Sequence, residues 1–203
     1  LMIMGYASSA SAAIPALLEK VEKKYLEKKS LEAKFSQTQY QKLTKMEKNL
    51  SGVISLKYPN KFRWETLKPD QNLFVSDGKK FWSYTPPFMK GEQGQVIEKK
   101  TSEVQSQLAS LLLSAAFSKI KDAKIVAISD SVFKVTPKKG TAGTVSQVEV
   151  EIDPKTAQIT RVKLEHDGGN RSEVKLSDIK LGEPMSDEMF RFVIPPGTEV
   201  IRE

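Results

Sequence analysis

The chain of 203 residues contains no cysteine and a single histidine, His166. The lack of cysteine excludes disulfide bonds, thiolate metal sites, a cysteine nucleophile and a lipid anchor attached through an N-terminal cysteine. A single histidine excludes metal sites built from two or three histidines and makes most histidine-based catalysis improbable. No apolar run approaches the about 20 residues that a membrane-spanning helix needs.

Arginine is scarce as well, since only 5 of the 32 basic residues are arginine and the others are lysine. Proteins that bind nucleic acids depend on arginine for bidentate and stacked contacts. The net charge of +7 therefore indicates a solvated, lysine-rich surface with some attraction to anionic membranes. We expect no nucleic-acid partner.

The sequence offers poor candidates for catalysis. His166 opens the run His-Asp-Gly-Gly-Asn, which we interpret as a solvated turn. No serine lies in the context of a nucleophile elbow, and no glycine-rich loop joins a strand to a helix where a phosphate would bind. Glu149, Glu151 and Asp153 alternate along one strand face, which favours an exposed sheet surface over a cation site. We therefore predict a protein that is not an enzyme and needs no cofactor or metal.

The first 13 residues differ from the rest of the chain because they carry no charge. Ala10-Ser11-Ala12 fits the small-x-small pattern of a signal-peptidase site. We interpret residues 1–13 as the remnant of a signal peptide, or otherwise as a disordered terminus, and residues 14–203 as a single domain. A signal peptide that is not followed by a cysteine predicts an exported, soluble protein of the periplasm.

Two segments have the apolar spacing of helices. Residues 14–29 repeat apolar side chains along a single stripe, and Pro15 fits the first turn. Residues 102–119 have a wider apolar face, and Ser102 with Gln105 forms a capping box at its start. A helix that is apolar on more than one side must contact something on more than one side.

The remainder of the chain alternates with period two, as strands do. Residues 61–65 place Phe62 and Trp64 on one face, and Asp77-Gly78 lies between two apolar runs, which predicts a hairpin with a type I′ turn. About eleven strands joined by short turns predict a mainly antiparallel α+β fold in which two helices cover one face of the sheet. The later strands are expected at residues 124–128, 132–136, 145–152, 159–165 and 173–179, followed by an extended tail at 190–197.

The apolar surface leaves two interpretations open. A sheet beneath the helix at 102–119 can enclose a packed core, or it can curve and leave a hydrophobic cavity. The loop at residues 86–94 carries Phe88 and Met89 between prolines and glycines, which indicates further exposed apolar surface. A cavity would suit a lipid, because burial of an acyl chain contributes about 0.8 kcal/mol per methylene.

Several short segments together identify a family resemblance. They are, in order, Phe35-Ser36-Gln37, Gly52-Val53-Ile54, the run from Tyr58 to Glu65, the run from Val75 to Pro86, Gln95-Val96, and Phe190-Arg191-Phe192 with Pro195-Pro196-Gly197. In this order, and with the signal-like start and the lack of cysteine, residues 14–201 resemble the periplasmic outer-membrane lipoprotein carrier proteins, the LolA family.

The resemblance implies an unclosed antiparallel β-barrel with helices as a lid over its concave face. It also implies a periplasmic chaperone, most simply a monomer, that binds the acyl chains of lipoproteins. Such a carrier takes its cargo from an ATP-driven inner-membrane release transporter and delivers it to an outer-membrane acceptor. By the same resemblance, Trp64 would line the acyl cavity, and Phe62, with Phe88 and Met89, would form the mouth that contacts partners. The lid would present Leu108, Leu111 and Leu112 to the acyl chains.

One position departs from the family pattern. Members of the family usually have arginine before the proline of the Tyr58-Pro59 step, and that arginine hydrogen-bonds the lid and is tied to release of cargo to the acceptor. A phenol offers one donor and no charge, whereas a guanidinium offers five donors. We therefore expect a different lid latch at Tyr58. The resemblance does not decide whether the protein has a dedicated outer-membrane acceptor. The alternative function is that of a paralogous periplasmic lipid-binding protein with the same fold and another cargo. A third function is that of an envelope stress-sensing or structural interaction module without a cavity.

Overall fold

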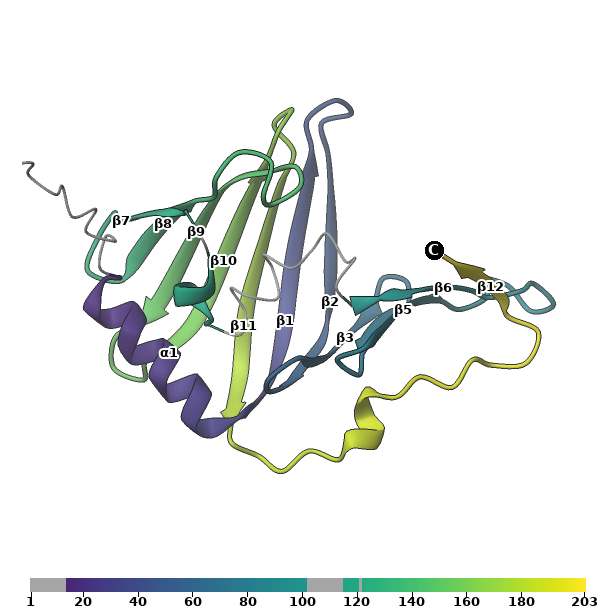
Figure 1. Cartoon of the computed structure of the whole chain (residues 1–203). Coiled ribbons are helices and arrows are strands. Elements are labelled where there is room, and N and C mark those ends of the chain that lie inside the picture. The colour runs from purple at the N-terminus through teal and green to yellow at the C-terminus, as the bar shows by residue number, and fades with distance from the viewer. Residues whose placement is uncertain (1–13, 102–114, 121) are drawn as a thin grey trace, which may run out of the picture.

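The computed structural model describes residues 14–101, 115–120 and 122–203, and these residues form one open sheet of twelve strands (Figure 1). The one α-helix among them is α1 (Ala16–Lys28), and two short 3-10 turns are η2 (Phe117–Lys119) and η3 (Asp187–Phe190). None of the described helices has the length and hydropathy needed to cross a bilayer. The strands are β1 (Ser30–Gln41), β2 (Met46–Lys57), β3 (Lys61–Lys68), β4 (Asn72–Ser76), β5 (Lys80–Thr85), β6 (Gln95–Lys100), β7 (Lys124–Ala127), β8 (Val132–Thr136), β9 (Val145–Asp153), β10 (Gln158–His166), β11 (Arg171–Leu181) and β12 (Glu199–Arg202).

The sheet consists of two meanders that meet at β1. The strand order is β12-β6-β5-β4-β3-β2-β1-β11-β10-β9-β8-β7, so β1 pairs with β2 on one side and with β11 on the other. Every pair is antiparallel except that of β12 with β6, which is parallel. The prediction of a mainly antiparallel, open sheet is confirmed. It did not include β12, which pairs in parallel at one edge of the sheet.

The extended tail predicted at residues 190–197 begins one residue later. Phe190 ends the 3-10 turn η3, Arg191 after it has extended backbone angles, and the chain enters a strand only at Glu199. Pro195 and Pro196 have no N–H group, so this part of the tail cannot supply the donors of a regular strand ladder. We call residues 182–198, which link β11 to β12, the C-terminal strap.

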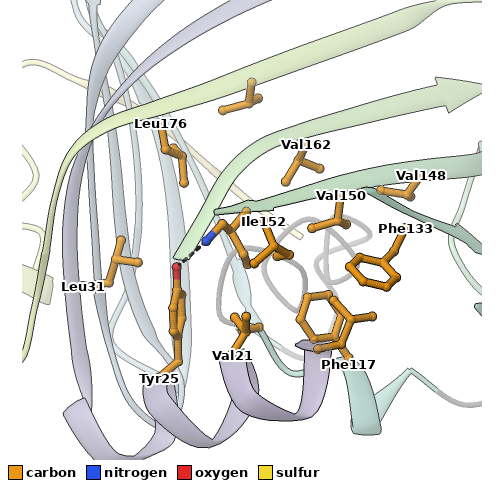
Figure 2. Close-up of a cluster of buried hydrophobic side chains, with 14 of the residues drawn as sticks. Val21, Tyr25, Leu31, Phe117, Phe133, Val148, Val150, Ile152, Val162 and Leu176 are labelled. Atoms are coloured by element: carbon orange, nitrogen blue, oxygen red, sulfur yellow. Dashed lines mark hydrogen bonds between the residues drawn. The ribbon is translucent and has the colours of Figure 1, made fainter. Parts of the chain in front are cut away.

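The first helix is confirmed and lies across the C-terminal half of the sheet (Figure 1). Its side chains Leu18, Val21 and Tyr25 are fully buried. Figure 2 shows Val21 and Tyr25 pointing from α1 toward the apolar side chains of the facing strands. The helix ends where Lys29 adopts a left-handed conformation and its N–H bonds to the carbonyl of Tyr25 at 3.0 Å. This half of the concave face is therefore filled with protein side chains.

The hydroxyl of Tyr25 ties α1 to the sheet. It accepts a buried hydrogen bond of 2.9 Å from the backbone N–H of Ile159 in β10 (Figure 2). Burial raises the pKa of Tyr25 to about 12, although the bond from Ile159 acts in the opposite direction. The phenol thus stays neutral at physiological pH and satisfies a backbone donor that would otherwise be buried without a partner.

The predicted second helix lies mostly outside the described residues, which resume at Ala115. The predicted end at residue 119 is wrong, because Phe117–Lys119 form the 3-10 turn η2. Ala115 has a φ of 57°, a left-handed conformation that an α-helix cannot contain. After this break, Phe117 is buried in the core, and Ser118 donates its N–H and its hydroxyl to the carboxylate of Glu22 in α1.

The hairpin at Asp77-Gly78 is confirmed, but its predicted type I′ turn is wrong. Ser76 pairs with Phe81, so the two central residues of the turn are Gly78 and Lys79. Only Gly78, with a φ of 95°, has a positive value, which is the φ pattern of a type II′ turn. The carboxylate of Asp77 accepts the N–H groups of Lys79 and Lys80 at 2.8 Å each. Asp77 therefore acts as a local acceptor rather than as a left-handed turn residue.

We expect Tyr25→Phe to lower the free energy of unfolding by about 1–3 kcal/mol, because the N–H of Ile159 would be left buried without an acceptor. Urea denaturation at neutral pH measures the change. Tyr40→Phe is the matched control, since Tyr40 is only partly buried and its ring, which lies 4.5 Å from the Arg171 guanidinium, is retained. Equal effects of the two substitutions would contradict the assigned role of the Tyr25 hydroxyl.

Tyr25 also predicts a dependence on alkaline pH. The unfolded chain deprotonates this phenol near its ordinary pKa of about 10, whereas the folded chain does so near 12. The stabilising contribution is therefore complete below pH 10 and is lost as the pH rises toward 12. The difference in unfolding free energy between the wild type and Tyr25→Phe should shrink over this range. A constant difference would refute the raised pKa of the Tyr25 phenol.

Candidate functional site

A cavity of about 670 Å³ lies beside the filled half of the concave face, over strands β1 to β5. Its volume falls within the range of about 300–1,000 Å³ that is typical of ligand pockets. No described residue of α1 contributes to its lining. The apolar lining residues are Leu50, Ile54, Leu56, Phe62, Trp64, Phe74, Phe81 and Phe88, and the polar ones are Gln37, Gln39, Lys48, Thr66, Asp70, Gln71, Asn72 and Thr85.

Strand alternation places these side chains in the cavity. In β3, Phe62 and Trp64 face the cavity, as the period-two pattern predicts. The residue between them, Arg63, bonds instead to Glu65 at 3.2 Å and to the carbonyl of Met189 at 3.5 Å. The charged face of β3 thus points toward the C-terminal strap, and its aromatic face points into the cavity.

The wall of the cavity is built from packed aromatic rings. The rings of Trp64 and Phe35 lie 4.7 Å apart between centroids, and Phe81 lies 5.9 Å from Phe62 and 6.0 Å from Phe74. Phe35 is itself buried in the core of the sheet. The rings therefore hold one another in place, which leaves an ordered apolar surface facing the cavity.

Gly52 makes the close approach of these rings possible. It lies opposite Phe35 in the β1–β2 pair, next to an irregularity in the β2–β3 pairing. A Cβ atom on Gly52 would lie 1.8 Å from the carbonyl oxygen of Glu65 and 2.9 Å from the Phe35 ring. Any larger residue would therefore push β3, and with it Trp64, away from its position.

The structure brings three of the predicted site residues together. Trp64, Phe62 and Phe88 all line the cavity, and Phe88 remains 82% exposed. Met89 is also exposed but is not among the lining residues that the structure describes. The predicted lid residues Leu108, Leu111 and Leu112 lie outside the described residues. The roles of all these residues in binding acyl chains or partners stay predictions.

Tyr58, the predicted latch, follows the last residue of β2. Its side chain is half-buried against the hydrophobic core, and its N–H bonds to the carbonyl of Lys29 at 2.9 Å. This position connects the start of the β2–β3 turn to the chain just after α1. Tyr58 is not among the described lining residues of the cavity, so any effect on a ligand would be indirect.

The polar part of the cavity was missed by the sequence analysis. Gln37 and Gln39 continue the inward face of β1 that begins with Leu31, Ala33 and Phe35. This parity is a signal that was present in the sequence, because residues two apart along a strand share a face. Asp70 and Gln71 come from the β3–β4 connection, whose position no local pattern gives, and Asn72 is the first residue of β4.

Other chemistry is not assembled in the described parts of the chain. Residues 14–101, 115–120 and 122–203 contain no group of three histidine, aspartate or glutamate side chains placed to hold a metal ion. His166 ends β10, and its Nδ1 atom lies 3.0 Å from the hydroxyl of Thr144, the residue before β9. Neither residue is among the described lining residues of the cavity.

Comparison with known proteins decides the family. The family model described as "Outer membrane lipoprotein carrier protein LolA" matches residues 27–193. This chain belongs to the LolA family. The outer-membrane lipoprotein carrier protein of Pseudomonas aeruginosa is 29% identical over 210 residues, which cover 97% of this chain and 89% of that protein. The LolA relative of the same name from Psychromonas ingrahamii is 32% identical over 203 residues, which cover 98% of this chain and 94% of its own length.

A solved structure shares the fold of this chain. An uncharacterized conserved protein from Thermus thermophilus aligns with a TM-score of 0.54 at 17% identity, and the alignment covers 92% of this chain and 97% of that one. At this identity the likeness shows a shared fold and nothing of the ligand. A LolA superfamily protein from Nitrosomonas europaea aligns with a TM-score of 0.48 at 14% identity, over 89% of this chain and 99% of that one.

We expect Gly52→Ala to lower the free energy of unfolding by at least about 1–3 kcal/mol, because the added methyl group overlaps the β3 backbone. Tryptophan fluorescence should also shift as Trp64 moves. Ser51→Ala, at the half-buried neighbouring position, is the control and should change both readouts little. A Gly52→Ala protein as stable as the wild type would show that β2 and β3 do not approach as closely as described.

Proposed function

We propose that this protein carries lipoproteins through the periplasm with their acyl chains held in the cavity over β1 to β5. The observation that carries the proposal is an ordered aromatic wall facing about 670 Å³ of space, on the half of the concave face that α1 leaves free. Membership of the LolA family and the name of its relatives, outer-membrane lipoprotein carrier proteins, support the same cargo.

The energetics of acyl transfer explain why such a wall is needed. Exposure of an acyl chain of roughly fifteen methylenes to water costs on the order of 12 kcal/mol. A carrier can remove the chain from a bilayer only if it offers comparable apolar surface. When it does, the chain passes between two apolar environments at little net cost, and the carrier itself needs no catalytic step and no nucleotide. The proposed role is therefore that of a chaperone rather than an enzyme.

The direction of transport must then come from partners. By analogy with the LolA family, we assign the loading step to an ATP-driven release transporter of the inner membrane, and unloading to an acceptor at the outer membrane. Phe88 suits a contact with such partners, since it is 82% exposed and also lines the cavity. A partner bound there would touch both the carrier and the entrance used by the cargo.

Tyr58 is proposed to tune the release of cargo. A neutral phenol at this position offers fewer hydrogen bonds to a lid than the arginine of the family pattern. The lid, assigned to the helix that carries Leu108, Leu111 and Leu112, would then be held more weakly. Weaker closure favours unloading to an acceptor of lower affinity.

We expect Trp64→Glu to reduce binding of a synthetic triacylated lipopeptide at least tenfold, because a carboxylate in the apolar wall must be desolvated when the acyl chains enter. Native mass spectrometry of the soluble complex measures the bound fraction. Leu67→Glu adds the same charge to the same strand at an exposed position outside the lining and should bind as the wild type does.

Trp64 also packs on Phe35, so a second variant separates binding from folding. Phe74→Glu changes a half-buried lining residue outside the buried core, and it should likewise abolish binding. Circular dichroism establishes that each variant is folded. Folded Trp64→Glu and Phe74→Glu proteins that bind lipopeptide as tightly as the wild type would overturn the proposed acyl site.

A further inference from the structure

The cavity has an apolar end and a polar end. Along β2 its lining runs from Leu56 and Ile54 to Leu50 and then to Lys48. The neighbouring strand β1 follows the same direction, since Gln37 pairs with Leu50 and Gln39 pairs with Lys48. The lining of the cavity therefore changes from hydrocarbon to polar groups along the strands, and a ligand bound in it is expected to show the same change along its length.

We call the group at this end the polar rim; it consists of Gln37, Gln39, Lys48, Asp70, Gln71 and Asn72. The structure fixes two of its amides. Gln37 donates to the hydroxyl of Ser172 at 2.8 Å, and Asn72 donates to the carbonyl of Tyr84 at 3.2 Å. The side chains of Gln39 and Gln71 make no hydrogen bond with the residues that the structure describes, so their amide groups are available to a ligand.

The charges of the polar rim cancel. Lys48 and Asp70 are the two charged side chains among the described lining residues, and they form an ion pair with 3.7 Å between Nζ and Oδ2. Their side chains are 56% and 58% exposed, so the pair lies at the entrance of the cavity rather than in its depth. An anion that enters here meets the carboxylate of Asp70, and it can use Lys48 only by competing with that carboxylate.

We propose that the polar rim binds the uncharged head of an acylated lipopeptide and that Asp70 disfavours lipids that carry a phosphate. This inference rests on the proposed function of the same cavity. The head of a lipopeptide consists of glycerol esters, a thioether and amides, and its carbonyl groups can accept hydrogen bonds from the free amide groups of Gln39 and Gln71. A phospholipid has similar acyl chains but places a negative charge at the same level.

Such a selection addresses a difficulty that an apolar wall cannot solve. Acyl chains of lipoproteins and phospholipids gain the same free energy from the wall, so discrimination must come from the head. Phospholipid is the bulk component of a bilayer, and a carrier without discrimination would fill with it. At the entrance Asp70 neutralises Lys48, so the polar rim offers a phosphate no net attraction, whereas its free amide groups can still donate to an ester or an amide.

The size of the effect follows from the exposure of the pair. Two unit charges about 4 Å apart in a water-like environment interact with a free energy that corresponds to about a fivefold change in affinity. Asp70→Asn removes the neutralising partner of Lys48, which is then free to attract phosphate. We therefore expect this substitution to shift selectivity about fivefold toward an anionic phospholipid while the acyl wall is unchanged.

The test is a competition between a synthetic triacylated lipopeptide and phosphatidylglycerol in detergent solution. Native mass spectrometry gives the ratio of lipopeptide-bound to phosphatidylglycerol-bound protein. The ratio should fall about fivefold in Asp70→Asn and should return close to that of the wild type in the double variant Lys48→Gln/Asp70→Asn. Asp130→Asn, at an exposed turn far along the chain from the cavity lining, is the matched control and should leave the ratio unchanged.

The outcomes separate this inference from the proposed function. If the wild type binds lipopeptide and Asp70→Asn keeps the wild-type ratio within twofold, the selection by Asp70 is refuted and the acyl carrier stands. If the wild type binds phosphatidylglycerol but no lipopeptide, the proposed cargo fails and the inference fails with it. A loss of selectivity in Asp130→Asn equal to that in Asp70→Asn would assign the effect to net charge and would also overturn the role of the polar rim.

Discussion

The pairing of β1 on both of its edges is the constraint on which the rest of the structure depends. β2 follows β1 directly in the chain, whereas β11 returns to it from the far end of the second meander. The register puts Phe35 opposite Gly52 on one side and Leu176 on the other. Because side chains alternate, this one register decides which residues of both halves face inward. A slip by one residue would send Phe35 and the two glutamines of the cavity to the opposite face.

The cavity follows from a mismatch in size between the helix and the sheet. α1 has 13 residues and is therefore about 20 Å long. Strands lie about 4.8 Å apart, so a helix of this length that crosses them covers about four. The sheet has twelve, and α1 packs over the second meander, where the Tyr25 hydroxyl anchors it to β10. The inward face of β2 to β5 therefore needs another cover, and its aromatic side chains remain available to a ligand.

Local patterns predicted those parts of the molecule that local interactions determine. Periodicity found α1, the β4–β5 hairpin and the shared face of Phe62 and Trp64, because each depends on neighbours a few residues away. It did not find the parallel pairing of β12 with β6, which joins segments about 100 residues apart and needs the strap to be placed first. The turn type failed because Asp77 and Gly78 each allow several turns, and the strand register selected among them.

The same distinction applies to the cavity. Alternation alone placed Trp64 on an inward face, but the idea that this face holds acyl chains came from the resemblance to the LolA family. The polar rim depends on where the β3–β4 connection sets Asp70 beside Lys48, a contact between positions 22 apart in sequence. The inward parity of Gln37 and Gln39 was visible in the sequence, and its meaning emerged only when the apolar end of the same cavity was known.

The two faces of β4 and β5 link the cavity to the C-terminal strap. Phe74 and Phe81 face the cavity, whereas Trp82 packs on the opposite side against Phe192 of the strap, with 6.4 Å between ring centroids. Asp187 fastens the start of η3 to β2 and β3, and its bonds from Lys57 and Lys61 lower its pKa to about 2.

This fastening is complete at neutral pH and is lost only as the pH falls from the ordinary aspartate range toward 2. Strands β4 and β5 carry apolar side chains on both faces, which explains why Asp77-Gly78 lies between two apolar runs in the sequence. It also means that the strap supports, from behind, the wall that faces the cavity.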